Sequence, residues 1–222
     1  MSGRRLQFHA LAAPGERWHT RAGVYLAVTL ACATAGAAGE LQELSITEHN
    51  GVYQVRVAMR LEAPAEQIFE VLTDYAHLYR LDSAITESLI LPPAPDGAVR
   101  VQTRLEDCVL FVCLEVRRVE RLHRLGPGEL VADIEPELSD FRSGHAHWRV
   151  RPQEHSAVVV YEGSMEPAFK LPPIIGPAVM KRKLRTQTLN TLGRIECIAR
   201  IRAQVATGEP IDPTRETERC IR

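Results

Sequence analysis

Apolar and polar residues alternate along most of the chain between residues 43 and 165, which is the period of a β-strand with one buried face. The clearest alternation runs from Val55 to Leu61. Asn50-Gly51 stands just before it, and both central positions of a type I′ turn need positive φ, so residues 43–62 are predicted to form a β-hairpin. Further strands are predicted at residues 85–91, 99–106, 112–117, 130–134, 144–150 and 157–165.

The apolar period changes to that of a helix in two places. The first begins after Ala63-Pro64 and ends near Leu72, and residues 77–81 are expected to add a further turn. The second runs from Pro172 to Ile201. Its apolar face comprises Met180, Leu184, Thr188, Thr191, Leu192, Ile195, Ile198 and Ala199. A long helix after a run of strands predicts an α+β fold, in which the helix lies across a curved sheet with an apolar space between them.

The last two predicted strands bring aromatic residues to the inner face of the sheet. We expect Val150 to pair with Ala157. This register would put Trp148 beside Val159 and Ala146 beside Tyr161, with His145, His147 and Glu162 on the outer face. After the long helix, residues 205–222 are polar and are expected to form a loosely held tail.

Residues 1–38 have the pattern of a secretory signal peptide. Four arginines come first, an apolar run without charge covers residues 22–35, and the small residues Ala35-Gly36-Ala37-Ala38 supply an Ala-x-Ala cleavage site. The mature chain is predicted to begin near Ala38 or Gly39, and to be periplasmic or secreted. The apolar run is short for a membrane span, and an uncleaved membrane anchor is the alternative.

Export changes the interpretation of the cysteines, because an oxidising compartment favours disulfides. One of the five cysteines is lost with the signal, and the spacing of the other four is not that of a zinc site. A hairpin around Val109–Val112 would place Cys108 opposite Cys113 on the outer face, so these two are predicted to form a disulfide. Cys197 and Cys220 are left as a second pair, because Cys197 points off the apolar face of the long helix.

Charge and motifs argue against several function classes. The formal charge of −1 and the lack of a basic groove with interleaved aromatic residues give no indication of nucleic-acid binding. The sequence contains no Gly-x-Ser-x-Gly motif, phosphate loop or dinucleotide fingerprint, and no metal or cofactor is predicted. Catalysis would need an acid, a base or a nucleophile in a cleft. The candidates are His77, His145 and His147 with Asp74, Asp140 or Glu162.

Three stretches of the chain carry a family resemblance. Residues 63–75 resemble the first helix of the coenzyme Q-binding branch of the START-like superfamily, also called the SRPBCC or polyketide cyclase superfamily. Phe141-Arg142-Ser143-Gly144 followed by Trp148, and residues 167–172 before the long helix, are similar to exported bacterial members. The resemblance implies a helix-grip fold, with a START-like ligand-binding domain at residues 39–204.

Proteins of this superfamily hold an apolar ligand between the sheet and the long helix, in a concave pocket with few polar groups. The resemblance therefore implies a pocket, and two sets of residues are expected around it. The first set lines the interior and comprises Val101, Leu114, Trp148, Tyr161, Met165, Leu184 and Ile195. The second lies near predicted element ends, where an entrance is expected, and comprises Tyr75, Tyr79, Phe141 and Phe169.

The sequence as a whole predicts an exported, non-enzymatic protein that binds or carries a lipid, a quinone or a polyketide-like compound. The apolar tip Val109–Val112 is a candidate for transient contact with a membrane or for the ligand entrance, and packing against a neighbouring loop is its alternative. Two other functions remain open at this point. One is a cyclase or dehydratase-like enzyme that acts in the same pocket, and the other is an interaction module with a solid core.

Overall fold

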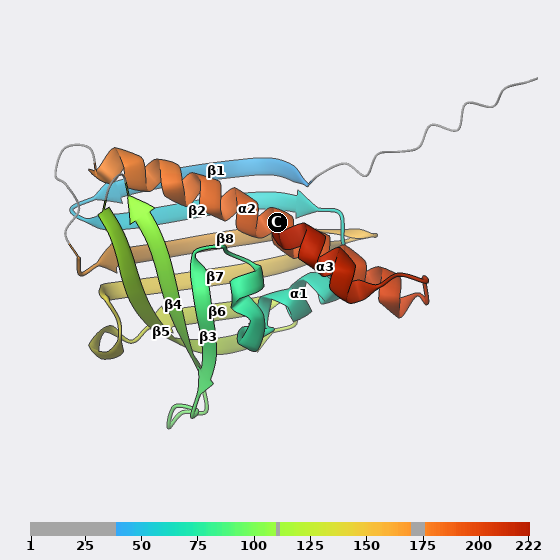
Figure 1. Cartoon of the computed structure of the whole chain (residues 1–222), viewed down its shortest axis with the longest axis horizontal. Coiled ribbons are helices and arrows are strands. Elements are labelled where there is room, and N and C mark those ends of the chain that lie inside the picture. The colour runs from blue at the N-terminus through green and yellow to red at the C-terminus, as the bar shows by residue number, and fades with distance from the viewer. Residues whose placement is uncertain (1–38, 110–111, 170–175) are drawn as a thin grey trace, which may run out of the picture. The chain divides into compact units, whose positions relative to one another are not determined.

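One antiparallel sheet of eight strands curves around a long helix that lies across its inner face (Figure 1). The computed structural model describes residues 39–109, 112–169 and 176–222. The strands are β1 (Glu40–His49), β2 (Val52–Leu61), β3 (Ile85–Leu91), β4 (Val99–Val109), β5 (Val112–Gly126), β6 (Glu129–Ile134), β7 (Phe141–Gln153) and β8 (Ser156–Pro167). Their order across the sheet is β1-β2-β8-β7-β6-β5-β4-β3, so the first hairpin pairs with the last strand.

Five helical segments complete the described fold. They are α1 (Ala65–Leu72), the 3₁₀ segments η1 (Tyr75–Arg80) and η2 (Pro136–Leu138), the long helix α2 (Gly176–Ala206) and α3 (Pro213–Ile221). The segments α1 and η1 carry the chain from β2 to the opposite edge strand, β3. This arrangement confirms the predicted α+β helix-grip fold.

The first hairpin forms for the predicted reasons. Asn50 and Gly51 both have left-handed backbone conformations, with φ of 51° and 83°, as a type I′ turn requires. In the strand that follows, every second side chain from Val55 to Leu61 is buried. This alternation gives β2 one face against the core and one face toward solvent.

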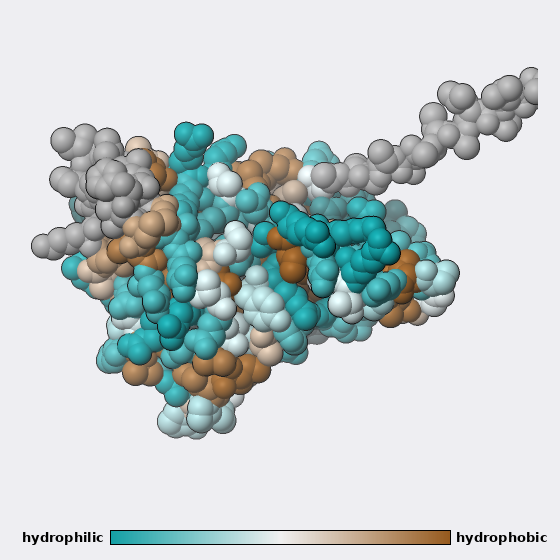
Figure 2. All heavy atoms as spheres, viewed as in Figure 1, coloured by the Kyte–Doolittle hydropathy of each residue, from teal (hydrophilic) through white to brown (hydrophobic). Residues whose placement is uncertain are grey.

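The main core lies beneath the C-terminal half of α2. Residues of this half that pack on the sheet are Leu192, Ile195, Ile198 and Ala199. They meet buried side chains of β2, β7, β8 and α1, including Leu61, Ile68, Val150 and Val159. Hydrophilic side chains predominate on the face of the molecule that carries α2 and α3 (Figure 2). Lys181, Arg182 and Arg185 of α2 are exposed, so the helix is amphipathic as predicted.

The hairpin β7–β8 is confirmed, but its predicted register is wrong by two residues. The predicted partner of Val150 is Ala157, in strands predicted at residues 144–150 and 157–165. Instead β7 continues through Pro152, and the chain turns at Glu154-His155, where Glu154 has a φ of 46°. A shift of two residues leaves each side chain on its predicted face. The observed pairs are Val150–Val159, Trp148–Tyr161 and Ala146–Gly163.

The hairpin β4–β5 has the predicted register. Val109 pairs with Val112, and Cys108 lies opposite Cys113, with which it forms a disulfide. Both cysteines are on the exposed side of the sheet. The side chains of the tip, residues 109–112, lie outside the described part of the structure, so their predicted contact with a membrane stays a prediction.

The C-terminal segment is ordered, in contrast to the loosely held tail that its polarity predicted. It forms α3, where the Asp212 side chain caps the helix by accepting hydrogen bonds from the Thr214 and Arg215 backbone N–H groups. A disulfide joins Cys220 to Cys197 of α2, as the second cysteine pair predicted. The composition of the tail did not reveal this, because a covalent link holds the segment without a large apolar face.

The two disulfides indicate a location outside the reducing cytoplasm. Within residues 39–109, 112–169 and 176–222, no helix is both long and apolar enough to cross a membrane. The predicted signal peptide, residues 1–38, lies outside the described residues, and its cleavage stays a prediction.

The two disulfides should differ in their contribution to stability. Loss of Cys197–Cys220, which spans 23 residues, should lower the free energy of unfolding by about 3 kcal/mol, whereas loss of Cys108–Cys113, which spans 5, should cost about 2 kcal/mol or less. Urea unfolding of the two double Ser variants measures both values. Hydrogen exchange should also rise in residues 213–221 of the first variant only. Equal exchange there in both variants would show that the disulfide does not hold α3.

Candidate functional site

A cavity of about 290 Å³ lies between the inner face of the sheet and the N-terminal half of α2. Its walls come from β4 to β8, from η1 and from the first turns of α2, and most of the lining side chains are apolar. The volume is just below the ~300–1,000 Å³ that small-molecule sites occupy, so the cavity suits a compact ligand.

Eight of the eleven residues predicted around a pocket line this cavity. They are Tyr75, Leu114, Phe141, Trp148, Tyr161, Met165, Phe169 and Leu184. The other three lie elsewhere: Val101 and Ile195 are fully buried among packed side chains, and Tyr79 is exposed on η1. Periodicity could not separate these positions, because the apolar stripes of β4 and α2 continue past the cavity into solid core.

The environment of α2 changes halfway along its apolar face. Met180, Leu184, Thr188 and Thr191 line the cavity, whereas Leu192 in the next position is fully buried in the core. Half of the helix therefore packs on the sheet, and the other half forms the roof of the cavity. The two threonines mark the boundary, since they lie on a face that is otherwise apolar.

Trp148 and Tyr161 form an aromatic wall of the cavity. They are opposite each other on β7 and β8, and their ring centroids are 4.3 Å apart. Gly163 makes room for this arrangement, because a Cβ atom at that position would collide with the Tyr161 hydroxyl. The pair presents a large apolar surface together with one phenol group.

A charged pair, Arg118 and Glu120, faces the same cavity from β5. The Arg118 Nε lies 3.0 Å from the Glu120 Oε2, and the two side chains are only 23% and 14% exposed. Their strand neighbours on this face, Val116 and Leu122, are buried apolar residues. The pair was not predicted, because the strand was predicted only as far as residue 117. The same alternation continued to residue 120 places both charges on the inner face.

Two phenol groups add to the polar side of the cavity. Burial raises the pKa of Tyr161 to about 12; the charge of Arg118 opposes this rise, and that of Glu120 adds to it. Burial also raises the pKa of Tyr75, against the opposing charge of Arg124. The Tyr75 hydroxyl is buried and makes no aligned hydrogen bond with any described residue. Both groups stay protonated at neutral pH, so both can donate a hydrogen bond to a ligand.

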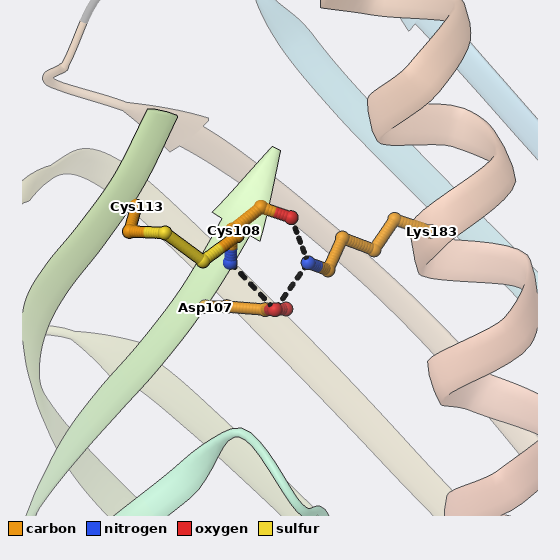
Figure 3. The surroundings of a disulfide bond; sticks show 4 residues. All are labelled: Asp107, Cys108, Cys113 and Lys183. Carbon is orange, nitrogen blue, oxygen red and sulfur yellow. Dashed lines mark hydrogen bonds and ion pairs between the residues drawn. A yellow bond between two sulfur atoms is a disulfide. The ribbon is translucent and has the colours of Figure 1, made fainter. Parts of the chain in front are cut away.

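A polar cluster joins α2 to the end of β4 beside the cavity (Figure 3). Lys183 of α2 contacts the Asp107 carboxylate and the Cys108 carbonyl oxygen. One turn further along α2, the Gln187 side chain donates a hydrogen bond of 2.9 Å to Asp107. We call Asp107, Lys183 and Gln187 the Asp107 clamp. All three line the cavity, and Lys183 and Asp107 are partly exposed, so the clamp forms one side of the cavity mouth.

The histidines considered for catalysis do not line the cavity. Each of the three has a carboxylate partner at 2.7 Å, in the pairs His77–Asp74, His145–Asp133 and His147–Glu129. Asp140 accepts a hydrogen bond from the Arg117 backbone, and Glu162 pairs with Arg56 and Arg149. Within the described ranges, no group of three His, Cys, Asp or Glu side chains is arranged to hold a metal ion.

Comparisons with known proteins agree with this geometry. The family model described as "Polyketide cyclase / dehydrase and lipid transport" matches residues 53–196. The search of curated protein sequences found no match. Three similar solved structures show the same fold at 14–17% sequence identity.

The first of these structures is the Zhui aromatase/cyclase from a Streptomyces species, with a TM-score of 0.54, 16% identity and coverage of 70% of this chain and 98% of that one. The second is a START superfamily protein from Mycobacterium smegmatis, with a TM-score of 0.51, 17% identity and coverage of 64% and 97%. The third is a STAR-related lipid transfer protein fragment from Xanthomonas axonopodis, with a TM-score of 0.50, 14% identity and coverage of 70% and 99%.

The matched residues include most of the sheet, the strand that carries Arg118 and Glu120, and α2 through its cavity-lining half. The family model thus covers the elements that form the cavity. The chain belongs to the polyketide cyclase/dehydrase and lipid transport family.

Proposed function

We propose that this protein binds and carries a compact hydrophobic molecule in the cavity between the sheet and α2, outside the cytoplasm. The observation that carries the proposal is a mostly apolar cavity of about 290 Å³ whose sheet wall carries the charged pair Arg118–Glu120. Such a combination offers apolar contact for affinity and a few polar groups for orientation. A family that includes lipid transport supports the same function.

The polar groups of the cavity favour an uncharged oxygen function on the ligand. The carboxylate of Glu120 already balances the charge of Arg118, so an anionic head group would meet Glu120 at short range. Arg118 still has further N–H donors, and Tyr75 and Tyr161 supply two hydroxyl donors. A carbonyl or hydroxyl oxygen is the acceptor that these groups would bind. Quinones and polyketide-like ketones carry such oxygens.

A cyclase or dehydratase-like enzyme is the second candidate, and the same charged pair favours it. A guanidinium can stabilise negative charge that develops on a carbonyl oxygen, and a carboxylate can accept a proton. One of the similar structures is an aromatase/cyclase. Incubation with a hydrophobic polyketone separates the two functions, because a carrier returns the compound unchanged and an enzyme returns a dehydrated or cyclised product.

Leu184→Trp should abolish ligand binding and leave the fold intact. Leu184 lines the cavity roof, so the larger ring would fill the space that a ligand occupies. The matched control is Leu192→Trp, two turns further along the same face. Leu192 is fully buried in the core, so overpacking there should lower the free energy of unfolding by about 1–3 kcal/mol. Displacement of a fluorescent hydrophobic probe and urea unfolding measure the two effects. A stable Leu184→Trp variant that binds the probe normally would contradict the placement of the ligand.

The charged pair should determine which ligands are preferred. Replacement of both residues by Met should keep the protein folded, because a buried ion pair can be exchanged for apolar side chains at little cost. Arg118→Met alone should lose about 3–5 kcal/mol, because Glu120 would remain buried without its partner. An alkylnaphthoquinone should bind the wild type at least about tenfold more tightly than the alkylnaphthalene of the same size.

That preference should disappear in the double Met variant, while the affinity for the alkylnaphthalene stays the same or rises. Isothermal titration with both compounds measures the change. An unchanged preference for the quinone in the folded double variant would show that Arg118 and Glu120 do not contact the ligand.

The Asp107 clamp should control the rate of ligand exchange. Lys183→Met removes the cation that joins α2 to the end of β4, so the mouth should open more often. Association and dissociation rate constants should both rise, with a smaller change in the equilibrium constant. Lys181→Met is the control, because Lys181 is exposed on the same turn of α2. Stopped-flow fluorescence measures the rates, and equal rates in the two variants would exclude a gating role.

A further inference from the structure

A buried carboxylate lies on the core side of α2, away from the cavity. Glu196 is only 5% exposed and is flanked along the helix by the fully buried Ile195 and the buried Ile198. Burial of a carboxylate among apolar groups is strongly unfavourable unless its charge is compensated. The fold must therefore offer Glu196 partners that offset this cost.

The partners of Glu196 come from the start of the described chain and from the end of β2. The Gly39 backbone N–H donates to one carboxylate oxygen at 2.9 Å, and the Glu62 backbone N–H donates to the other at 3.0 Å. Among the residues that the structure describes, no Arg or Lys side chain forms an ion pair with Glu196. Two uncharged backbone N–H groups are thus the hydrogen-bond donors to the buried Glu196 carboxylate.

The space around Gly39 is too small for a side chain. A Cβ atom there would lie 2.7 Å from the Arg60 carbonyl oxygen and 2.9 Å from the Glu196 Oε2. Both distances are shorter than van der Waals contact allows, and the first involves backbone that cannot turn away. The structure thus admits only glycine where the chain meets Glu196, directly before β1 begins at Glu40.

We propose that the bond between Ala38 and Gly39 is the processing site, and that Glu196 binds the α-ammonium group which cleavage creates. A signal peptidase would hydrolyse this amide, with the hydroxyl of water going to the Ala38 carbonyl carbon and a proton to the Gly39 nitrogen. The amine that is released takes up a second proton near neutral pH. The nitrogen that donates one neutral hydrogen bond in the precursor then carries a positive charge 2.9 Å from the carboxylate.

The structure also distinguishes between two cleavage sites that the sequence allows. Small residues at Ala35 and Ala37 would permit a cut before Ala38, whereas those at Gly36 and Ala38 permit a cut before Gly39. Only the second cut places the new ammonium group on the atom that Glu196 contacts. A chain that began at Ala38 would keep an amide at that point.

The ion pair would fasten the start of the edge strand β1 to α2, which lies beside it (Figure 1). Because the charge exists only after cleavage, this contact would be completed only in the processed, exported protein. The inference does not depend on what the cavity binds.

The test uses the full chain, exported from a bacterial host and purified from the periplasm. N-terminal sequencing should give Gly-Glu-Leu-Gln, the sequence that begins at Gly39. A second precursor has Ser-Ala inserted between Ala38 and Gly39, so that processing after the inserted Ala still yields a Gly39 terminus while processing after Ala38 leaves a two-residue extension. Intact mass identifies each product, and the extended form supplies a chain in which Gly39 has a neutral amide.

Thermal unfolding of four proteins then measures the coupling: the Gly39 terminus and the extended terminus, each with Glu196 and with Glu196→Gln. The extension should lower the melting temperature by about 3–6 °C when Glu196 is present, and by less than about 1 °C in the Glu196→Gln background. Equal effects in both backgrounds would overturn the proposal, as would a native terminus at Ala38.

Amine labelling gives a second readout that does not require the Glu196→Gln variant to be as stable as the wild type. Reductive methylation with isotopic formaldehyde should modify the Gly39 α-amino group at least about tenfold more slowly than the exposed Lys181. Glu196→Gln should remove this protection. An α-amino group that reacts as fast as Lys181 in the wild type would contradict its pairing with Glu196.

Discussion

Apolar contact between the C-terminal half of α2 and the strands β2, β7 and β8 holds the helix across the sheet. Leu192 and Ile195 are fully buried there, against Leu61 and Val159. Because its C-terminal half is packed on the sheet, α2 can hold its N-terminal half over the cavity without side chains that fill the space beneath it. The cavity under Leu184 can therefore remain open in a stable protein.

The polar groups inside the cavity support the proposed binding of a ligand. An apolar replacement of Arg118 and Glu120 would keep the sheet intact, so stability alone does not explain a charged pair on an apolar wall. The buried Tyr75 hydroxyl without an aligned partner points the same way, because such a group gains from any acceptor that enters. Glu196 differs from these groups, because its buried carboxylate accepts hydrogen bonds from the backbone N–H groups of Gly39 and Glu62.

Much of the fold followed from the sequence, because strand alternation and turn chemistry are local properties. Asn50-Gly51 and the facing cysteines Cys108 and Cys113 specified their hairpins correctly. The register of β7–β8 was predicted wrongly, because alternation determines which face a side chain occupies but does not locate the turn, which lies at Glu154-His155. Cavity and core could not be told apart at Val101 and Ile195, since both environments demand apolar side chains. The order of α3 was missed because its contacts with α2, which include the Cys197–Cys220 disulfide and a hydrogen bond from Arg194 to the Ile221 carbonyl oxygen, join residues far apart in the sequence.

Binding of a hydrophobic molecule in the space beneath α2 can be tested by native mass spectrometry of the exported protein, mixed with a total lipid extract and then desalted. We expect a complex with one small hydrophobic molecule per chain, released on collisional activation and recovered chemically unchanged. A protein that keeps only its ligand-free mass across the extract would exclude the carrier function, because the cavity would then be a packing defect and not a binding site.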